Sequence, residues 1–242
     1  MVGWSYGVSE TPTPSVVPSP AGIDRGQGVA RIVGGLLAVL CLSVVEVGVI
    51  SVFAPGVDSL AARMVAQALF ALTLIGIALA LATPGQKPAA LGSLGLRPPT
   101  RSPLLLATLA YLAYVGFAIA YGTVVQPQQE DVTRDLGYGH GGVGTIAAVL
   151  LVVTVAPVSE ELFFRGFMFG GLRKRLSFLS AALIPAAVWG LLHYTGPDSV
   201  GVIPQLAFFG LVLAWVYEKS GSLWPAIGVH AANNAIAFAL LT

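Results

Sequence analysis

The chain has 242 residues, of which 56% are hydrophobic and only 10% are charged, whereas soluble domains average about 25% charged residues. This composition predicts a membrane protein with several spanning segments and leaves no room for a sizeable soluble domain. The formal net charge of +1 gives no basis for nucleic-acid binding, and a single cysteine excludes an intramolecular disulfide.

The first part of the chain, residues 1–28, differs from the rest. It is rich in Pro, Ser, Thr and Gly, as in the run TPTPSVVPSPAG, and it shows no apolar periodicity. Such a segment has too little apolar surface to offset the entropy of ordering, so we expect a disordered N-terminal tail. We expect transmembrane helices in residues 29–142 and a catalytic core, within the same bundle, in residues 143–242.

Seven apolar segments follow the tail, and most have the roughly 20 residues that a spanning helix requires. A backbone exposed to lipid must satisfy its own hydrogen bonds, so we predict an all-α fold, a polytopic transmembrane bundle of about seven helices. An eighth, half-length segment would change the side on which the chain ends. The segments are residues 29–53, 60–83, 103–125, 143–171, 178–194, 200–218 and 223–241.

Charges in the connections indicate the orientation of this bundle in a cell membrane. Three basic clusters fall on one side if there are seven spans, and the acidic loop 126–142 falls on the other. The positive-inside rule then predicts a cytoplasmic N-terminus. The basic residues are Arg25 and Arg31, then Lys87, Arg97 and Arg101, then Arg173, Lys174 and Arg175.

Polar residues interrupt three of the last four spans. Glu160 and Glu161 lie in one of the most apolar stretches, His193 ends the next span, and His230 lies in the last span with two asparagines. An ionisable group within a membrane is costly and is by default functional. We expect the three spans to bring these groups into one layer near the middle of the membrane.

Helical spacing suggests different roles for Glu160 and Glu161. Glu161 and Arg165 are four residues apart and share a face, which favours an ion pair, whereas Glu160 points about 100° away and faces elsewhere. A carboxylate in a low-dielectric site suits general acid–base chemistry near neutral pH. The alternative is a purely structural ion pair beside one protonated glutamate.

In the last span, His230 and Asn234 also share a face, with Asn233 close to it. Both side chains donate hydrogen bonds and could stabilise a developing oxyanion. The alternative is hydrogen bonding between membrane helices, for which Asn and His are commonly used.

These spacings resemble the three motifs of the CPBP family of intramembrane proteases, which includes type II CAAX prenyl endopeptidases and Abi-like proteins. EELFFR, from Glu160 to Arg165, matches EExxxR, and HAANN, from His230 to Asn234, matches HxxxN. His193 with Trp189 resembles FxxxH, with another aromatic residue where Phe is usual. The resemblance covers about residues 143–242.

The resemblance implies an endopeptidase that hydrolyses a peptide bond of a membrane or lipidated substrate, with membrane lipid and a peptide or protein as its partners. Glu160 and His193 would activate water, and His230 and Asn234 would form the oxyanion hole. Glu161, Arg165 and Asn233 would support them.

A zinc-dependent version is also open, in which Glu160, His193 and His230 supply a His₂Glu ligand set. The usual zinc-protease signature HExxH is absent, so we favour a site without a cofactor.

Two other classes of protein remain as alternatives. The first is a non-catalytic membrane protein, such as an immunity or partner-stabilising factor that retains a silent site. The second is a proton-coupled transporter, which would show interrupted helices repeated in two halves, and no internal repeat is visible. Nine Arg against three Lys, with abundant Ala, Gly and Val, are typical of a bacterium with a GC-rich genome.

Overall fold

The computed structural model describes residues 25–53, 60–82, 90–100, 102–127 and 142–240. Every regular element in these ranges is a helix and none is a strand, so the prediction of an all-α helix bundle is confirmed. The expected tail lies mostly outside the described residues, although the first helix begins at Arg25 rather than at residue 29. Most of the acidic loop, including His140, also lies outside them.

Where the structure describes them, all seven expected segments are mainly helical, but residues 192–194 of the fifth lie beyond the end of its helix. The chain begins with two long helices, α1 (Arg25–Phe53) and α2 (Leu60–Ala82). A short helix, α3 (Ala90–Ser93), then precedes α4 (Pro103–Val125), and a continuous helical run of several parts follows from Gly142 to Arg173. After this run come α9 (Phe178–Leu191), the 3₁₀ turn η3 (Pro197–Gly201), α10 (Val202–Ser220) and α11 (Leu223–Leu240). Within the described ranges, five helices are long and apolar enough to cross a membrane, and α9 is shorter.

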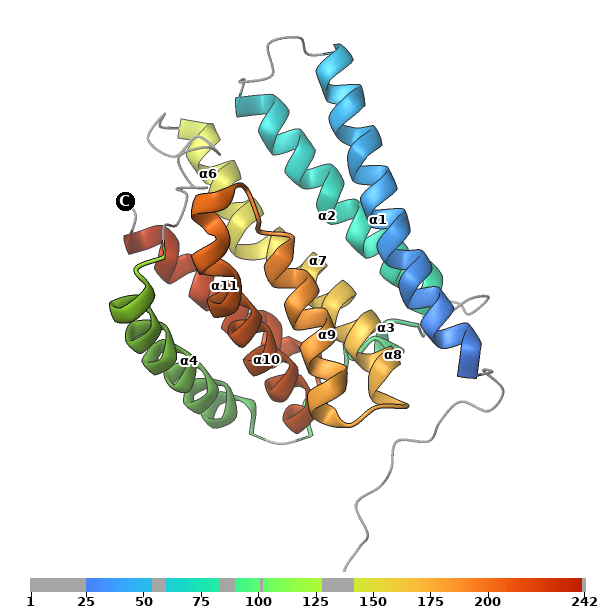
Figure 1. The fold of residues 1–242 in the computed structure, drawn as a ribbon, viewed down its shortest axis with the longest axis vertical. Helices are drawn as coiled ribbons and strands as arrows, with labels where there is room; N and C mark the ends of the chain where they lie inside the picture. The colour runs from blue at the N-terminus through green and yellow to red at the C-terminus, as the bar shows by residue number, and fades with distance from the viewer. Residues whose placement is uncertain (1–24, 54–59, 83–89, 101, 128–141, 241–242) are drawn as a thin grey trace, which may run out of the picture.

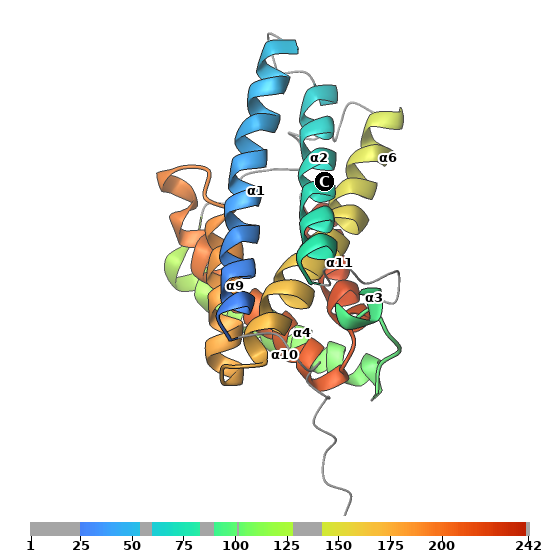
Figure 2. The same ribbon diagram turned by 90° about the vertical axis from the view of Figure 1, so that its right-hand side faces the viewer.

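The run from Gly142 to Arg173 is the central element of the bundle. It consists of α6 (Gly142–Leu150), η1 (Leu151–Val155), α7 (Ala156–Glu160), η2 (Glu161–Phe169) and α8 (Gly170–Arg173). Helix α2 packs on one side of it, and α9, α10 and α11 pack on the other (Figure 1). Helix α4 packs on the outer side of α10 and α11. Helix α1 packs along α2, and the first turns of α1 contact α8 (Figure 2).

Burial follows this arrangement. All nine residues of η2 are buried, including two charged ones. Large apolar side chains are exposed on the outer helices, for example Val44 at 73% on α1 and Leu104 at 77% on α4. An outer surface of this kind suits contact with lipid chains rather than with water.

Small residues let the helices around the site approach one another closely, as is usual in membrane bundles. A Cβ atom at Gly210 on α10 would lie 2.9 Å from the Cβ of Ala186 on α9. A Cβ at Gly166 in η2 would lie 2.8 Å from the carbonyl oxygen of Leu94. These two positions therefore require glycine for steric reasons, Gly166 within the central helix and Gly210 on α10.

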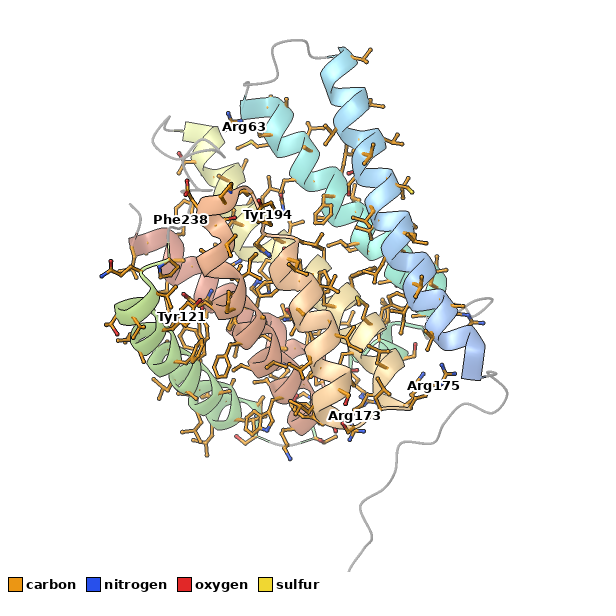
Figure 3. All side chains as sticks on the ribbon, in the orientation of Figure 1. Arg63, Tyr121, Arg173, Arg175, Tyr194 and Phe238 are labelled. Carbon is orange, nitrogen blue, oxygen red and sulfur yellow. The ribbon has the colours of Figure 1, made fainter. Side chains whose placement is uncertain are left out.

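The segment after α3 fixes the turn between α10 and α11. The backbone N–H of Leu223 donates to the carbonyl of Gly95 at 2.8 Å, and the N–H of Thr100 donates to the carbonyl of Ser220 at 2.9 Å. Arg173 on α8 adds a half-exposed ion pair with Glu218 on α10 at 2.8 Å. Figure 3 shows Arg173 and Arg175 at this end of the bundle and Arg63 near the opposite end.

Candidate active site

The helix that carries both glutamates is not a regular α-helix. Two π-helical stretches, η1 and η2, lie on either side of α7, and π-turns inside α-helices are frequent at functional sites. In η1 the N–H of Ala156 bonds to the carbonyl of Leu151, five residues back. The next bond in this register would run from residue 157 to the carbonyl of Val152, but residue 157 is proline and has no N–H.

Asn234 takes the place of that missing donor. Its side-chain Nδ2 donates to the carbonyl oxygen of Val152 at 2.9 Å, which ties α11 to η1. The amide has a second hydrogen, which this bond does not use. Asn233 donates to Asn234 Oδ1 at 3.5 Å, so the two neighbouring amides are linked.

The expected ion pair between Glu161 and Arg165 is present. Arg165 Nη1 lies 2.7 Å from Glu161 Oε1, and the two side chains are 1% and 0% exposed. Within the described part of the chain, Glu161 Oε2 and Arg165 Nη2 have no hydrogen-bond partner. Gly210 leaves space beside the guanidinium, because a Cβ there would lie 3.1 Å from Nη2. This pair is therefore fully removed from solvent and held on a single hydrogen bond.

His230 lies between the two carboxylates. Its Nδ1 is 2.9 Å from Glu161 Oε1, and its Nε2 is 3.8 Å from Glu160 Oε2. The prediction that Glu160 faces away from the Glu161 cluster is wrong in this respect, since both carboxylates face one imidazole. The prediction considered only the helix that carries the two glutamates, whereas the imidazole from α11 presents a different nitrogen to each carboxylate.

The charges constrain the protonation of this cluster. Glu161 accepts a hydrogen bond from Arg165 and is therefore taken as ionised, so the Nδ1 of His230 must carry the hydrogen that lies between them. A proton on Nε2 as well would make the charges of Glu160, Glu161, Arg165 and His230 sum to zero.

Glu160 is held by a tryptophan. The indole N–H of Trp189 on α9 donates to Glu160 Oε2 at 2.6 Å. Trp189 is 2% exposed, whereas the Glu160 side chain is 13% exposed and is the most accessible of the four charged groups. Within the described residues, no hydrogen bond is made by its other oxygen, Oε1. Glu160 is therefore the carboxylate of the cluster with an open edge.

His193 lies just beyond the end of α9, with an exposed side chain. Its Nδ1 is 2.8 Å from the carbonyl oxygen of Trp189 and must carry the hydrogen, because a carbonyl only accepts. In the neutral ring this leaves Nε2 with a free lone pair. The rings of His193 and Trp189 meet edge to face with centroids 4.8 Å apart. The structure thus connects His193 to Glu160 through Trp189.

The zinc-dependent alternative requires Glu160, His193 and His230 to lie close enough together to share one ion. Among the described residues, no group of three His, Cys, Asp or Glu side chains is placed to hold a metal ion. The Nδ1 atoms of both histidines are engaged, with the carbonyl of Trp189 and with Glu161, which leaves their Nε2 atoms for other contacts.

Trp189 is the site residue whose importance the sequence did not reveal. The indole contacts His230 as well, with ring centroids 5.4 Å apart, and Arg165 lies over its ring at 5.1 Å. The sequence held one indication of this role, which is that tryptophan stands where the FxxxH motif usually has phenylalanine. Unlike phenylalanine, tryptophan has an N–H that can donate a hydrogen bond.

Comparison with known proteins covers the half of the bundle that holds this cluster. Residues 142–236 match the family model described as Type II CAAX prenyl endopeptidase Rce1-like. This part of the chain is similar to the Rce1-like family. The match extends from α6 into α11 and so includes all seven polar residues predicted for the site. The five long apolar helices of the described ranges are those of a membrane protein.

Curated relatives are similar over the same region. YyaK of Bacillus subtilis, whose name calls it uncharacterized, is 38% identical over 96 residues, which are 37% of this chain and 31% of YyaK. YdiL of Bacillus subtilis, whose name gives it as a candidate membrane peptidase, is 30% identical over 93 residues, or 37% of this chain and 36% of YdiL. YxdF of Lactococcus lactis is 30% identical over 106 residues, 43% of this chain and 56% of YxdF. The chain thus spans about a third to a half of these relatives, and no solved structure matches it.

Proposed function

We propose that this protein is an intramembrane endopeptidase that hydrolyses a peptide bond of a membrane-embedded or lipid-bearing substrate. The observation that supports this most is the state of Glu160. One of its oxygens is held by Trp189 and faces His230, and the other makes no hydrogen bond within the part of the chain that the structure describes. A fixed carboxylate with one free edge, inside a membrane bundle of peptidase type, is suited to act as a general base.

In the proposed mechanism, two atoms activate the water, Glu160 Oε1 and His193 Nε2. Glu160 Oε1 accepts a proton from a water molecule, and the Nε2 lone pair of His193 holds the same water from the other side. The water oxygen attacks the carbonyl carbon of the substrate. When the carbon–nitrogen bond breaks, Glu160 returns the proton to the leaving nitrogen, so the products are a carboxylic acid and an amine.

The oxyanion of the tetrahedral intermediate is stabilised from α11. His230 offers Nε2–H, and Asn234 offers the amide hydrogen that Val152 does not take. The Nε2 of His230 lies 3.8 Å from Glu160, so donor and base face one small space. Removing one oxyanion donor typically lowers kcat by about 10²–10³-fold.

Substrate access is proposed from the cytoplasmic side, with the N-terminus in the cytoplasm. The basic end of the bundle, with Arg173, Lys174 and Arg175, then lies against the anionic cytoplasmic leaflet. A peptide or protein substrate would reach the site from this leaflet, either through its own membrane segment or through an attached lipid.

The test compares membrane peptides from cells that produce the wild-type protein or Glu160→Gln. New peptide termini should appear with the wild type and disappear with Glu160→Gln at equal protein level. Glu46→Gln is the matched control, because Glu46 is also a membrane carboxylate, bonded to Thr73 at 2.6 Å and placed on α1 outside the site. The proposal is wrong if Glu160→Gln yields the same new termini as the wild type.

A further inference from the structure

We propose that Trp189 is a positioning residue for Glu160, so that the reaction of this chain depends on the indole N–H and not only on the aromatic ring. The inference rests on the proposed function, because it assigns to Trp189 the task of aiming the general base. The indole N–H holds Oε2 and so turns Oε1 toward the water.

The hydrogen bond itself is short and isolated from solvent. The distance from Trp189 Nε1 to Glu160 Oε2 is 2.6 Å, and Trp189 is 2% exposed. An indole N–H can only donate, and it donates here to a carboxylate. Hydrogen bonds to ionised acceptors are about twice as strong as those between neutral groups.

Packing fixes the indole more firmly than it fixes the carboxylate. The ring meets His193, His230 and Phe209 with centroid distances of 4.8, 5.4 and 6.1 Å, and the guanidinium of Arg165 lies 5.1 Å from its centroid. A ring surrounded in this way cannot turn without moving three helices. The direction of its N–H is therefore set by the bundle, and the carboxylate follows it.

The bond also decides which oxygen of Glu160 is the base. Both donors that face Glu160, the Trp189 indole and His230 Nε2, are on the side of Oε2. Phenylalanine, the usual residue at this motif position, would fill most of the ring space but would supply no N–H. With phenylalanine the carboxylate would lose its only close donor among the described residues and could turn either oxygen to the water.

Two replacements of Trp189 distinguish the effect of the N–H group from the effect of the aromatic ring. Trp189→Phe removes the N–H and shrinks the ring, and replacement of Trp189 by benzothienylalanine removes the N–H while keeping the bicyclic shape. Both should lower kcat about tenfold, the equivalent of one hydrogen bond to a charged group, with KM changed less than about twofold. Trp215→Phe, the same change on α10 away from Glu160, should leave both constants unchanged.

A second measurement reads the contact without activity. In the ¹⁵N-indole spectrum of the full-length protein, the Trp189 N–H resonance should move upfield in Glu160→Gln, because the charged acceptor is lost, and should not move in Glu46→Gln. The positioning role is overturned if the resonance does not respond, or if both replacements of Trp189 keep full kcat while Glu160→Gln is inactive. If Glu160→Gln itself cleaves normally, the proposed function fails instead, and the positioning role fails with it.

Discussion

The buried pair of Glu161 and Arg165 gives the sharpest stability prediction. Glu161→Gln keeps the size of the side chain but removes a charge that is 0% exposed and lies 2.7 Å from Arg165 and 2.9 Å from His230. The guanidinium, 1% exposed, would then be buried without a counter-charge on its own face. Breaking a buried ion pair in this way destabilises a protein by about 3–5 kcal/mol.

The free energy of unfolding can be measured by titration with SDS in mixed micelles, followed by tryptophan fluorescence. The double variant Glu161→Gln/Arg165→Gln should recover much of the loss, because it removes both charges, and the two single changes should therefore be strongly non-additive. Glu46→Gln should lower stability by less than about 1.5 kcal/mol, the worth of one partly buried hydrogen bond. A Glu161→Gln protein within about 1 kcal/mol of the wild type would refute the reasoning.

Three further predictions follow from the site and its supports. Gly210→Ala should destabilise the bundle by about 1–3 kcal/mol through contact with Ala186 and Arg165, whereas Gly116→Ala, where a Cβ meets open space, should not lower stability in the same SDS titration. Asn234→Ala should lower kcat at least about 10²-fold with little change in KM; full activity would exclude it from the oxyanion hole. Elemental analysis should find less than one zinc per chain, and activity should be retained after chelation. A tightly held zinc whose removal abolishes activity and whose return restores it would contradict the metal-free mechanism.

The sequence was sufficient to predict the helices and part of the site. Apolar length alone marks the spans, since lipid allows the backbone few alternatives. The pairing of Glu161 with Arg165 follows from a spacing of four residues on one helix, and it is observed. Local geometry of this kind is encoded within a few residues of each partner.

The contacts of Glu160 could not be predicted in the same way. The approach of His230 depends on how α11 packs against the central helix, where Asn234 bonds to the carbonyl of Val152, 82 residues away in the chain. The hydrogen bond from Trp189 depends likewise on how close α9 approaches α7. Both features need the packed positions of three helices, which no periodicity in the sequence contains.

Hydrolysis in water labelled with ¹⁸O is the most direct test of the central claim. The purified protein is reconstituted in liposomes with a membrane peptide identified from the cell comparison, and the newly formed C-terminus is examined by mass spectrometry. The account predicts that the wild type produces a C-terminus carrying ¹⁸O and that Glu160→Gln produces at least about 10³-fold less of it in the same time. Equal production of labelled C-termini by Glu160→Gln and the wild type would contradict it.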